Sequence, residues 1–427
     1  MSVLVPLILL LLALSGTPLF VVIAASAIWG FYQTDIDLMV MAVEIYRIAE
    51  MPVLIAIPLF TFAGYLLGES KAPQRLVRIT DAFLGWMPGG LAIVALVTCA
   101  LFTAFTGASG VTIVALGALL VPALQKSGYP ERFNLGLVTT SGSLGLLFAP
   151  SLPLILYGVV AQQMSLDVAV SIDDLFLAGL LPGGLMLVAL SLYSGWVSRK
   201  TERNHHPFDK TEAWAALKDT KWEMPLPFLV LGGIYGGWFA VSEAAAITAF
   251  YVLIVSTLIR REIPFKQLIT VMRDSMKLVG AILLILAVSM ASTNYMIDAG
   301  VPEKIFGFIQ QHVSDSFTFL LLLTVFLLIL GMMLDIFSAI VIMIPIILPI
   351  AVEYGIHPIH LGILFLANMQ LGYFTPPVGM NLFIASFRFN KPVMELYRAT
   401  LPFFFILLAT VLVITFWPGL SLAFIGE

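Results

Sequence analysis

The sequence has few charged residues. Only 11% of its 427 residues are charged, whereas 60% are apolar, and an ordinary soluble domain has roughly 25% charged residues. The mean hydropathy is +1.04. This composition excludes a soluble protein and predicts a chain surrounded by the lipid bilayer, and we expect no nucleic-acid partner.

Cysteine is also nearly absent, since Cys99 is the only one. A lone cysteine in an apolar run excludes disulfides and cysteine-based metal sites, and we expect it to be a small buried side chain. His357 and His360 have a spacing that could hold a metal on a helix, but no carboxylate lies beside them. We therefore predict neither a transition-metal site nor a cofactor.

Sequence patterns for several kinds of catalysis are missing as well. There is no nucleotide-binding loop, no pair of intramembrane aspartates and no nucleophile–base constellation. These absences argue against an ATP-driven pump and against a membrane enzyme, so we expect that the chain is not an enzyme.

Long apolar runs fill the sequence instead. A helix needs about 20 apolar residues to cross the hydrocarbon layer, and the runs predict an all-α polytopic protein with ten crossings and two helical hairpins that turn back inside the membrane. The predicted crossings are residues 3–14, 17–31, 52–68, 133–163, 175–197, 225–240, 242–260, 276–297, 359–386 and 396–420, and the hairpins are residues 89–126 and 317–352.

The basic residues predict how the chain is oriented. Lys and Arg are retained on the cytoplasmic side of a membrane. With the first residues outside, this threading puts all of the 21 basic residues on one face except Arg47 and Lys304. We therefore predict a multi-pass membrane protein with a cytoplasmic basic face and both termini outside. In the inner membrane of a bacterium or archaeon, which we expect as its location, the termini would be periplasmic.

The two halves of the chain resemble each other at a fixed offset. A shift of 227 positions aligns Pro122 with Pro349, Gly128 with Gly355, and Pro150 with Pro377. Each half then has five crossings and one hairpin in the same order, and the odd number of crossings inverts the second copy. The predicted units are a first inverted repeat (1–197), a cytoplasmic loop (198–224) and a second inverted repeat (225–427).

Glycine and proline interrupt four apolar segments. Two interruptions are the hairpin tips, near Thr106–Gly110 and Asp335–Ala339. At the first tip, flanking arms of about 15 apolar residues are too short to span comfortably and predict a turn inside the membrane. The other two lie within crossings 133–163 and 359–386, which should be discontinuous helices. Irregular backbone at membrane depth is tolerated where it lines a cavity or is buried in protein.

These interruptions predict a solute and cation site at mid-membrane. Unwound helix ends present carbonyl oxygens to a hard cation, and half-helix N-termini attract an anion. The alternatives are that the Gly and Pro residues only kink packed helices, and that single Ser residues bond their own backbone. Asp335 could face the cation or the substrate, or it could cap the helix after it, and Glu243 is expected to cap a helix.

Two stretches outside the crossings alternate basic and apolar residues at near-helical spacing. They are Lys71–Leu84 and Pro264–Leu278. Such amphipathic segments are typical of helices that lie along the membrane interface.

Several motifs resemble the large membrane subunit of tripartite ATP-independent periplasmic (TRAP) transporters, within the ion transporter superfamily. They are Phe105–Gly110, Gly128–Phe133, Ser141–Gly145 through Pro150–Pro153, Ser242–Ala245 and Gly372–Gly379. The resemblance covers essentially the whole chain.

This resemblance implies sodium-coupled uptake of a small organic anion, such as a carboxylate or sulfonate, by an elevator-type motion. It also implies two partners, a small four-helix membrane subunit and a periplasmic substrate-binding protein. A stand-alone cation-coupled organic-anion symporter or antiporter of the same superfold is the alternative.

The residues expected to form the sites lie at the tips and breaks. The first cation site is assigned to Thr106, Ser109, Ser141, Gly142, Ser143 and Gly145. The second cation site is assigned to Asp335, Ser338, Gly372, Thr375, Pro376 and Gly379. The substrate site is assigned to Ser109, Pro150, Ser151, Ser338 and Pro377.

Overall fold

The computed structural model describes residues 4–15, 17–34, 36–87, 89–164, 168–199 and 208–425, and these are helical with no strand among them. The elements before residue 200 are α1 (Leu4–Leu14), α2 (Leu19–Gln33), α3 (Met39–Ala49), η1 (Pro52–Ile55), α4 (Ala56–Glu69), α5 (Ala72–Leu84), α6 (Gly90–Thr106), α7 (Ser109–Lys126), α8 (Glu131–Ser141), η2 (Leu144–Leu147), α9 (Leu152–Gln162), α10 (Ile172–Ala178) and α11 (Leu180–Ser198). The later elements are α12 (Lys210–Asp219), α13 (Pro225–Tyr235), α14 (Val241–Ile254), the π-turn η3 (Val255–Ile259), α15 (Phe265–Asp298), α16 (Val301–Gln310), α17 (Ser316–Met333), α18 (Ile336–Glu353), α19 (Pro358–Gly372), α20 (Met380–Phe389), α21 (Val393–Phe416) and α22 (Gly419–Leu422).

Eight helices in the described ranges are long and apolar enough to cross a membrane. A ninth span is formed if α8, η2 and α9, which bend by 40° at their break, are taken together. Three of the eight are hairpin arms, namely α7, α17 and α18, with 18 residues each. The prediction that the arms of the first hairpin are too short to span is therefore wrong for α7, and length alone does not make either hairpin re-entrant.

The polar segments contain more helix than the sequence predicts. The stretch 264–278 does not form a separate interfacial helix, because α15 runs unbroken for 34 residues through it and the following crossing. An α-helix of that length extends about 51 Å, which exceeds the hydrocarbon thickness of about 30 Å. Segment 198–224 is not simply a loop, since its described part contains α12.

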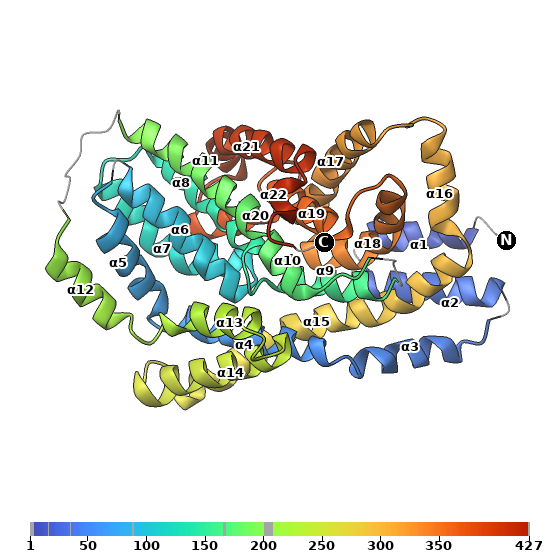
Figure 1. The fold of residues 1–427 in the computed structure, drawn as a ribbon, viewed down its shortest axis with the longest axis horizontal. Coiled ribbons are helices and arrows are strands. Elements are labelled where there is room, and N and C mark those ends of the chain that lie inside the picture. The colour runs from blue at the N-terminus through green and yellow to red at the C-terminus, as the bar shows by residue number, and fades with distance from the viewer. Residues whose placement is uncertain are drawn as a thin grey trace.

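The two hairpins occupy corresponding positions in the chain. Ser109 and Ile336 begin α7 and α18 and are 227 positions apart, as are Lys126 and Glu353, which end these helices. Figure 1 shows α9, α10, α19 and α20 between the hairpin α6–α7 and the hairpin α17–α18. Matching bounds agree with the predicted repeat, while the inverted orientation stays a prediction.

The halves interlock through these elements. The second-half helix α20 packs against α7 of the first hairpin, and α18 of the second hairpin packs against the first-half helix α9. Away from this centre, α4 packs against α14 and α15, and α2 packs along α15. Each hairpin therefore contacts a broken helix of the other half.

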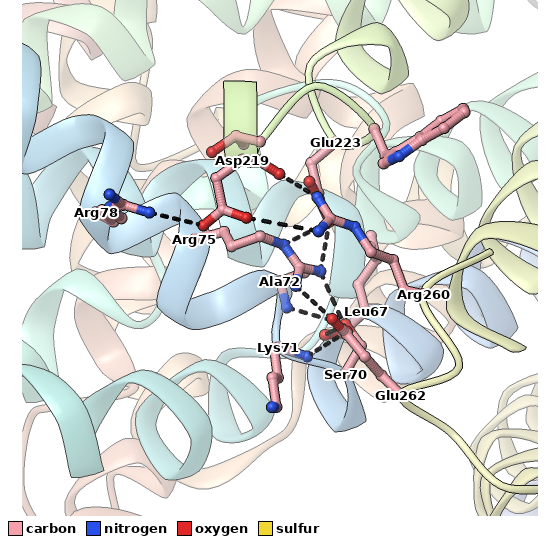
Figure 2. A network of polar contacts seen from close by, with 12 residues as sticks. Leu67, Ser70, Lys71, Ala72, Arg75, Arg78, Asp219, Glu223, Arg260 and Glu262 are labelled. Atoms are coloured by element: carbon pink, nitrogen blue, oxygen red, sulfur yellow. Dashed lines mark hydrogen bonds and ion pairs between the residues drawn. The ribbon is translucent and has the colours of Figure 1, made fainter. Parts of the chain in front are cut away.

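A buried arginine joins three distant segments outside this centre (Figure 2). Arg75, near the start of α5, donates to Glu223 before α13 and to Glu262 between α14 and α15. Their side chains are 8%, 5% and 11% exposed, respectively. The Glu262 carboxylate also accepts from the backbone N–H of Lys71 at 2.9 Å. We call Arg75, Glu223 and Glu262 the α5 anchor.

The surroundings of Glu262 in the α5 anchor favour its ionised form. Burial acts against ionisation of Glu262, but hydrogen bonds from Arg75 and from the Lys71 backbone outweigh it, so the pKa of the Glu262 carboxyl lies below its ordinary value. Next to this cluster, Arg78 pairs with Glu212 and Asp219 at 2.9 and 3.0 Å, but its side chain is 43% exposed. The buried and exposed arginines thus belong to one network with different solvent access.

Candidate functional site

The first hairpin tip is built around Gly107. This residue ends α6 at a φ of +63°, a conformation that glycine adopts without steric cost. A Cβ there would lie 2.5 Å from Leu152, the first residue of α9. The tip therefore rests on the helix that follows the first break.

Hydroxyl groups of the first tip bond to both broken helices. Ser109 donates to the Asn381 side-chain oxygen at 2.8 Å, and Asn381 belongs to the second half. Thr103 lies 2.6 Å from Thr112 and donates to the carbonyl of Gly142 at 2.9 Å. Each residue in these contacts is buried, so the hydrogen bonds form in surroundings of low dielectric constant.

The first break lies directly against this tip. A Cβ on Gly142 would be 3.3 Å from the Ser109 carbonyl, and a Cβ on Gly145 would be 2.2 Å from the Ala100 carbonyl. Glycine at these positions allows backbone to approach backbone. The structure therefore brings Gly142 to Ser109, as predicted, whereas Gly145 lies against the middle of α6.

The serines of the first break bond within their own segment. Ser141 donates to the Val138 carbonyl at 3.3 Å, and Ser143 donates to the Thr140 carbonyl at 3.2 Å. Such local bonds are the structural alternative for these serines. In contrast, the buried hydroxyl of Thr140 has no hydrogen-bond partner in the described part of the chain.

The second hairpin tip is held by a carboxylate. Asp335 accepts from the backbone N–H groups of Phe337 and Ser338 at 3.0 Å each and from the Ser338 hydroxyl at 2.5 Å. This is the N-cap geometry that stabilises a helix start, and it confirms the capping alternative for Asp335. Glu243 likewise accepts from Ala240 N at 2.9 Å, which confirms its expected capping role.

The second break runs from Tyr373 to Gly379. The backbone N–H of Ile336, at the second tip, donates to the Tyr373 hydroxyl at 2.6 Å, and Gly379 N donates to the Met332 carbonyl at 3.1 Å. Thr375 donates to the Leu371 carbonyl of its own helix at 2.6 Å. The break is therefore fixed to the second hairpin by two bonds.

The remaining predicted residues differ in exposure. Thr106, Pro150 and Ser151 are buried, and Ser151 donates to the Leu146 carbonyl. Pro376 and Pro377 are exposed, so the structure does not bring them into the same surroundings as the buried residues. Both breaks contain a cis peptide, at Pro150 and at Pro377.

Sequence reasoning missed two residues of this cluster. Asn381 follows the second break, and Thr103 lies one helical turn before the first tip. A polar side chain one turn from a tip, in an otherwise apolar helix, is the signal that could have found Thr103. For Asn381 no such signal exists, because its partner is 272 residues away.

Four helices begin at the tips and breaks, and the N-termini of three of them, α7, α9 and α20, meet. The Gly107–Leu152 contact puts the starts of α7 and α9 together, and the Ser109–Asn381 bond joins α7 to α20. The start of α18 meets the second break through Ile336. Converging N-termini suit an anion, and the hydroxyl and carbonyl oxygens suit a hard cation.

His357 and His360 do not share a metal-binding arrangement. His360 contacts the Ser421 hydroxyl and the Thr415 carbonyl at 3.1 and 3.2 Å, while His357 accepts from the backbone N–H of Ile359. Within the described ranges, no group of three or more His, Cys, Asp or Glu side chains could hold a metal ion. Cys99 is buried, as predicted.

Comparison with known proteins identifies the family. Residues 4–420 match the family described as "Tripartite ATP-independent periplasmic transporter, DctM component". The chain is 31% identical over 426 residues to the C4-dicarboxylate TRAP transporter large permease protein DctM of Rhodobacter capsulatus, covering 97% of this chain and 96% of that protein. It is also 35% identical over 380 residues to the isethionate TRAP transporter permease protein DctMQ of Oleidesulfovibrio alaskensis. That match covers 87% of this chain but 58% of the relative's length.

The fold also resembles a solved transporter structure. The YdaH transporter of Alcanivorax borkumensis matches with a TM-score of 0.62 at 16% identity, covering 89% of this chain and 87% of that one. At this identity the likeness concerns the fold alone. Taken with the family match over nearly the whole chain, these findings show that the chain is a multi-pass membrane permease of the TRAP transporter family, belonging to its DctM components.

Proposed function

We propose that this chain carries out sodium-coupled secondary uptake of a small organic anion across the inner membrane. The observation that carries the proposal is the convergence of three helix N-termini, those of α7, α9 and α20, with buried hydroxyl and carbonyl oxygens around Ser109 and the first break. The relatives' names concern C4-dicarboxylates and isethionate, which are anions of the carboxylate and sulfonate classes.

The residues of the first half fit a cation. The unpartnered hydroxyl of Thr140 and the Thr103–Gly142 pair supply oxygens beside an unwound helix end, the kind of ligand that holds Na⁺ in transporters with broken helices. Asp335 and Ser338 would serve the second site, where the carboxylate already orders the helix start. The anion would lie nearer the helix N-termini, between the tips.

The proposal includes two partners. A small four-helix membrane subunit and a periplasmic binding protein would act with this chain, and the binding protein would deliver the substrate. The DctMQ relative extends well beyond the part that this chain matches, which supports a further membrane component. In the proposed topology both termini are periplasmic, and the basic loops would face the cytoplasm.

Two alternatives are separated by simple measurements. A stand-alone symporter or antiporter of the same superfold would transport without any binding protein. A channel would pass single-channel currents in planar bilayers, which the proposed transporter does not.

Replacing Ser109 with alanine is expected to weaken sodium activation. The change removes one tip oxygen and leaves the buried Asn381 oxygen unpaired; a lost bond to a charged group is worth about 1.5–3 kcal/mol. We therefore expect the sodium concentration for half-maximal uptake to rise at least about tenfold, measured in proteoliposomes containing the complete transporter.

Ser275→Ala is the matched control, because Ser275 is also buried but bonds only the Met272 carbonyl of its own helix, α15. It should leave the half-maximal sodium concentration unchanged. Equal sodium activation in the Ser109→Ala and Ser275→Ala proteins would remove Ser109 from the site.

A further inference from the structure

Both hairpin tips are bonded to a single segment, residues 373–381. At the second tip, the Tyr373 hydroxyl accepts from Ile336 N at 2.6 Å. At the first tip, the Asn381 side-chain oxygen accepts from the Ser109 hydroxyl at 2.8 Å. The two ends of the segment are joined to each other, because Asn381 N donates to the Tyr373 carbonyl at 2.9 Å.

Asn381 also holds the first broken helix. Its side-chain nitrogen donates to the Thr139 carbonyl at 3.3 Å, near the end of α8. One carboxamide therefore connects the start of α7, the end of α8 and the start of α20. The connected groups come from both halves of the chain and from both kinds of interruption.

The first half has no counterpart of this segment. The shift of 227 positions that aligns the hairpins puts Leu146 and Leu154 where the second half has Tyr373 and Asn381. Leucine side chains neither donate nor accept hydrogen bonds. The two-tip connection is therefore made once, by the second break, although the packing of α20 on α7 and of α18 on α9 is reciprocal.

Burial makes these bonds dependent on one another. Tyr373, Asn381 and Ser109 are 3%, 0% and 6% exposed, respectively. A buried polar group without a hydrogen-bond partner carries an uncompensated desolvation penalty. When one group leaves its partner, the remaining groups must therefore rearrange to regain their hydrogen bonds. If the Ser109 oxygen turns toward a cation, Asn381 must shift, and its backbone bond transmits that shift to Tyr373.

We propose that residues 373–381 couple the two hairpin tips, with Tyr373 and Asn381 as positioning residues, so that cation binding at one tip changes affinity at the other. This inference rests on the proposed sodium-coupled function and adds an energetic link between its two cation sites. Such a coupling is reciprocal between the two sites by thermodynamic necessity.

A double-variant comparison tests the coupling. Ser109→Ala and Tyr373→Phe alter different tips, and the two side chains bond different partners; independent changes at such sites multiply. Each variant raises the half-maximal sodium concentration by some factor relative to the unmodified protein. We expect the factor for the double variant to be at least about fivefold smaller than the product of the factors for the two single variants. In proteins that also carry Asn381→Leu, the effects of the two changes should simply multiply.

Two controls exclude general damage. Tyr354→Phe removes a hydroxyl that bonds the Val313 carbonyl, at the other end of α18 from the tip, and its effect should multiply with that of Ser109→Ala. Asn368→Leu removes a buried amide bonded to Leu364 within α19. In proteins that carry Asn368→Leu, the combined effect of Ser109→Ala and Tyr373→Phe should remain smaller than the product of their separate effects.

A measurement without transport covers variants that cannot support uptake. With Cys99→Ser, the reporter Phe337→Cys provides a single thiol at the second tip, whose labelling rate by a maleimide is recorded at increasing sodium. We expect Ser109→Ala to shift the sodium concentration for half-protection at least about fivefold, and Asn381→Leu to abolish that shift.

The outcomes separate the two ideas. Simple multiplication of effects in otherwise native protein, together with no shift in thiol protection, would overturn the coupling while leaving sodium-driven uptake intact. An absence of sodium dependence in the unmodified complete transporter would overturn the proposed function itself.

Discussion

Replacing Arg75 with alanine is expected to destabilise the protein by about 3–5 kcal/mol, the usual cost of removing one partner of a buried ion pair. The change leaves two carboxylates without their ion-pair partner in a buried position, because the Glu223 and Glu262 side chains are only 5% and 11% exposed. One Glu223 oxygen already lacks a hydrogen-bond partner among the described residues. Thermal unfolding of the detergent-purified protein should report this loss.

Arg78→Ala provides the control for this prediction. Arg78 also pairs with two carboxylates but is 43% exposed, and exposed pairs contribute about 0–1 kcal/mol. Adding Glu223→Gln and Glu262→Gln to Arg75→Ala should restore part of the lost stability, because no buried charge then remains unpaired. Equal melting temperatures for the Arg75→Ala and Arg78→Ala proteins would contradict the buried role of the α5 anchor.

Replacing Gly372 with alanine is the second change with a large expected effect. A Cβ there would lie 2.3 Å from the backbone carbon of Gly331, so α17 and α19 would have to separate. Overpacking costs about 1–3 kcal/mol, and no rotamer change can relieve a clash with backbone. We therefore expect a loss near the upper end of this range, about 3 kcal/mol, and a smaller monodisperse fraction in size-exclusion chromatography.

Gly280→Ala is the matched control within a helix. Apart from its chain neighbours and the backbone of its own helix, no atom of the described residues lies within 4 Å of a Cβ built on Gly280 in α15, so alanine should be neutral or stabilising by up to about 1 kcal/mol. If Gly372→Ala were tolerated as well as Gly280→Ala, the close contact of α17 and α19 would not be needed for folding.

The positions of the tips and breaks could be predicted from sequence because they depend on local chemistry. Gly107 has a positive φ, and Asp335 caps the helix that follows it; both are properties that a residue type brings to its own segment. The order of apolar runs likewise gave the hairpins within one or two residues of their observed bounds.

The helix α15 shows why a change in polarity is a poor guide to helix ends. The sequence pattern predicts two separate segments, an interfacial stretch at 264–278 and a crossing at 276–297, because basic residues give way to an apolar run near Leu278. That change marks a new environment around the helix, whereas ending a helix requires a breaker. The sequence from Phe265 to Asp298 contains no proline and one glycine, Gly280, so the helix continues.

The contacts between distant segments could not be predicted in this way. Arg75 lies 148 residues from Glu223 and 187 from Glu262, and Ser109 lies 272 residues from Asn381. Their pairing depends on how helices from both halves interlock, which no local pattern encodes. The residues that connect the site were therefore missed, although those that form its turns were found.

Uptake driven by an imposed sodium gradient tests the central proposal most directly. Proteoliposomes would contain this chain and its small membrane subunit, with the loaded periplasmic binding protein outside and a labelled C4-dicarboxylate or isethionate as substrate. We expect accumulation with sodium outside, and none with a potassium or proton gradient alone or without the binding protein. Accumulation that is equal with and without a sodium gradient would contradict it.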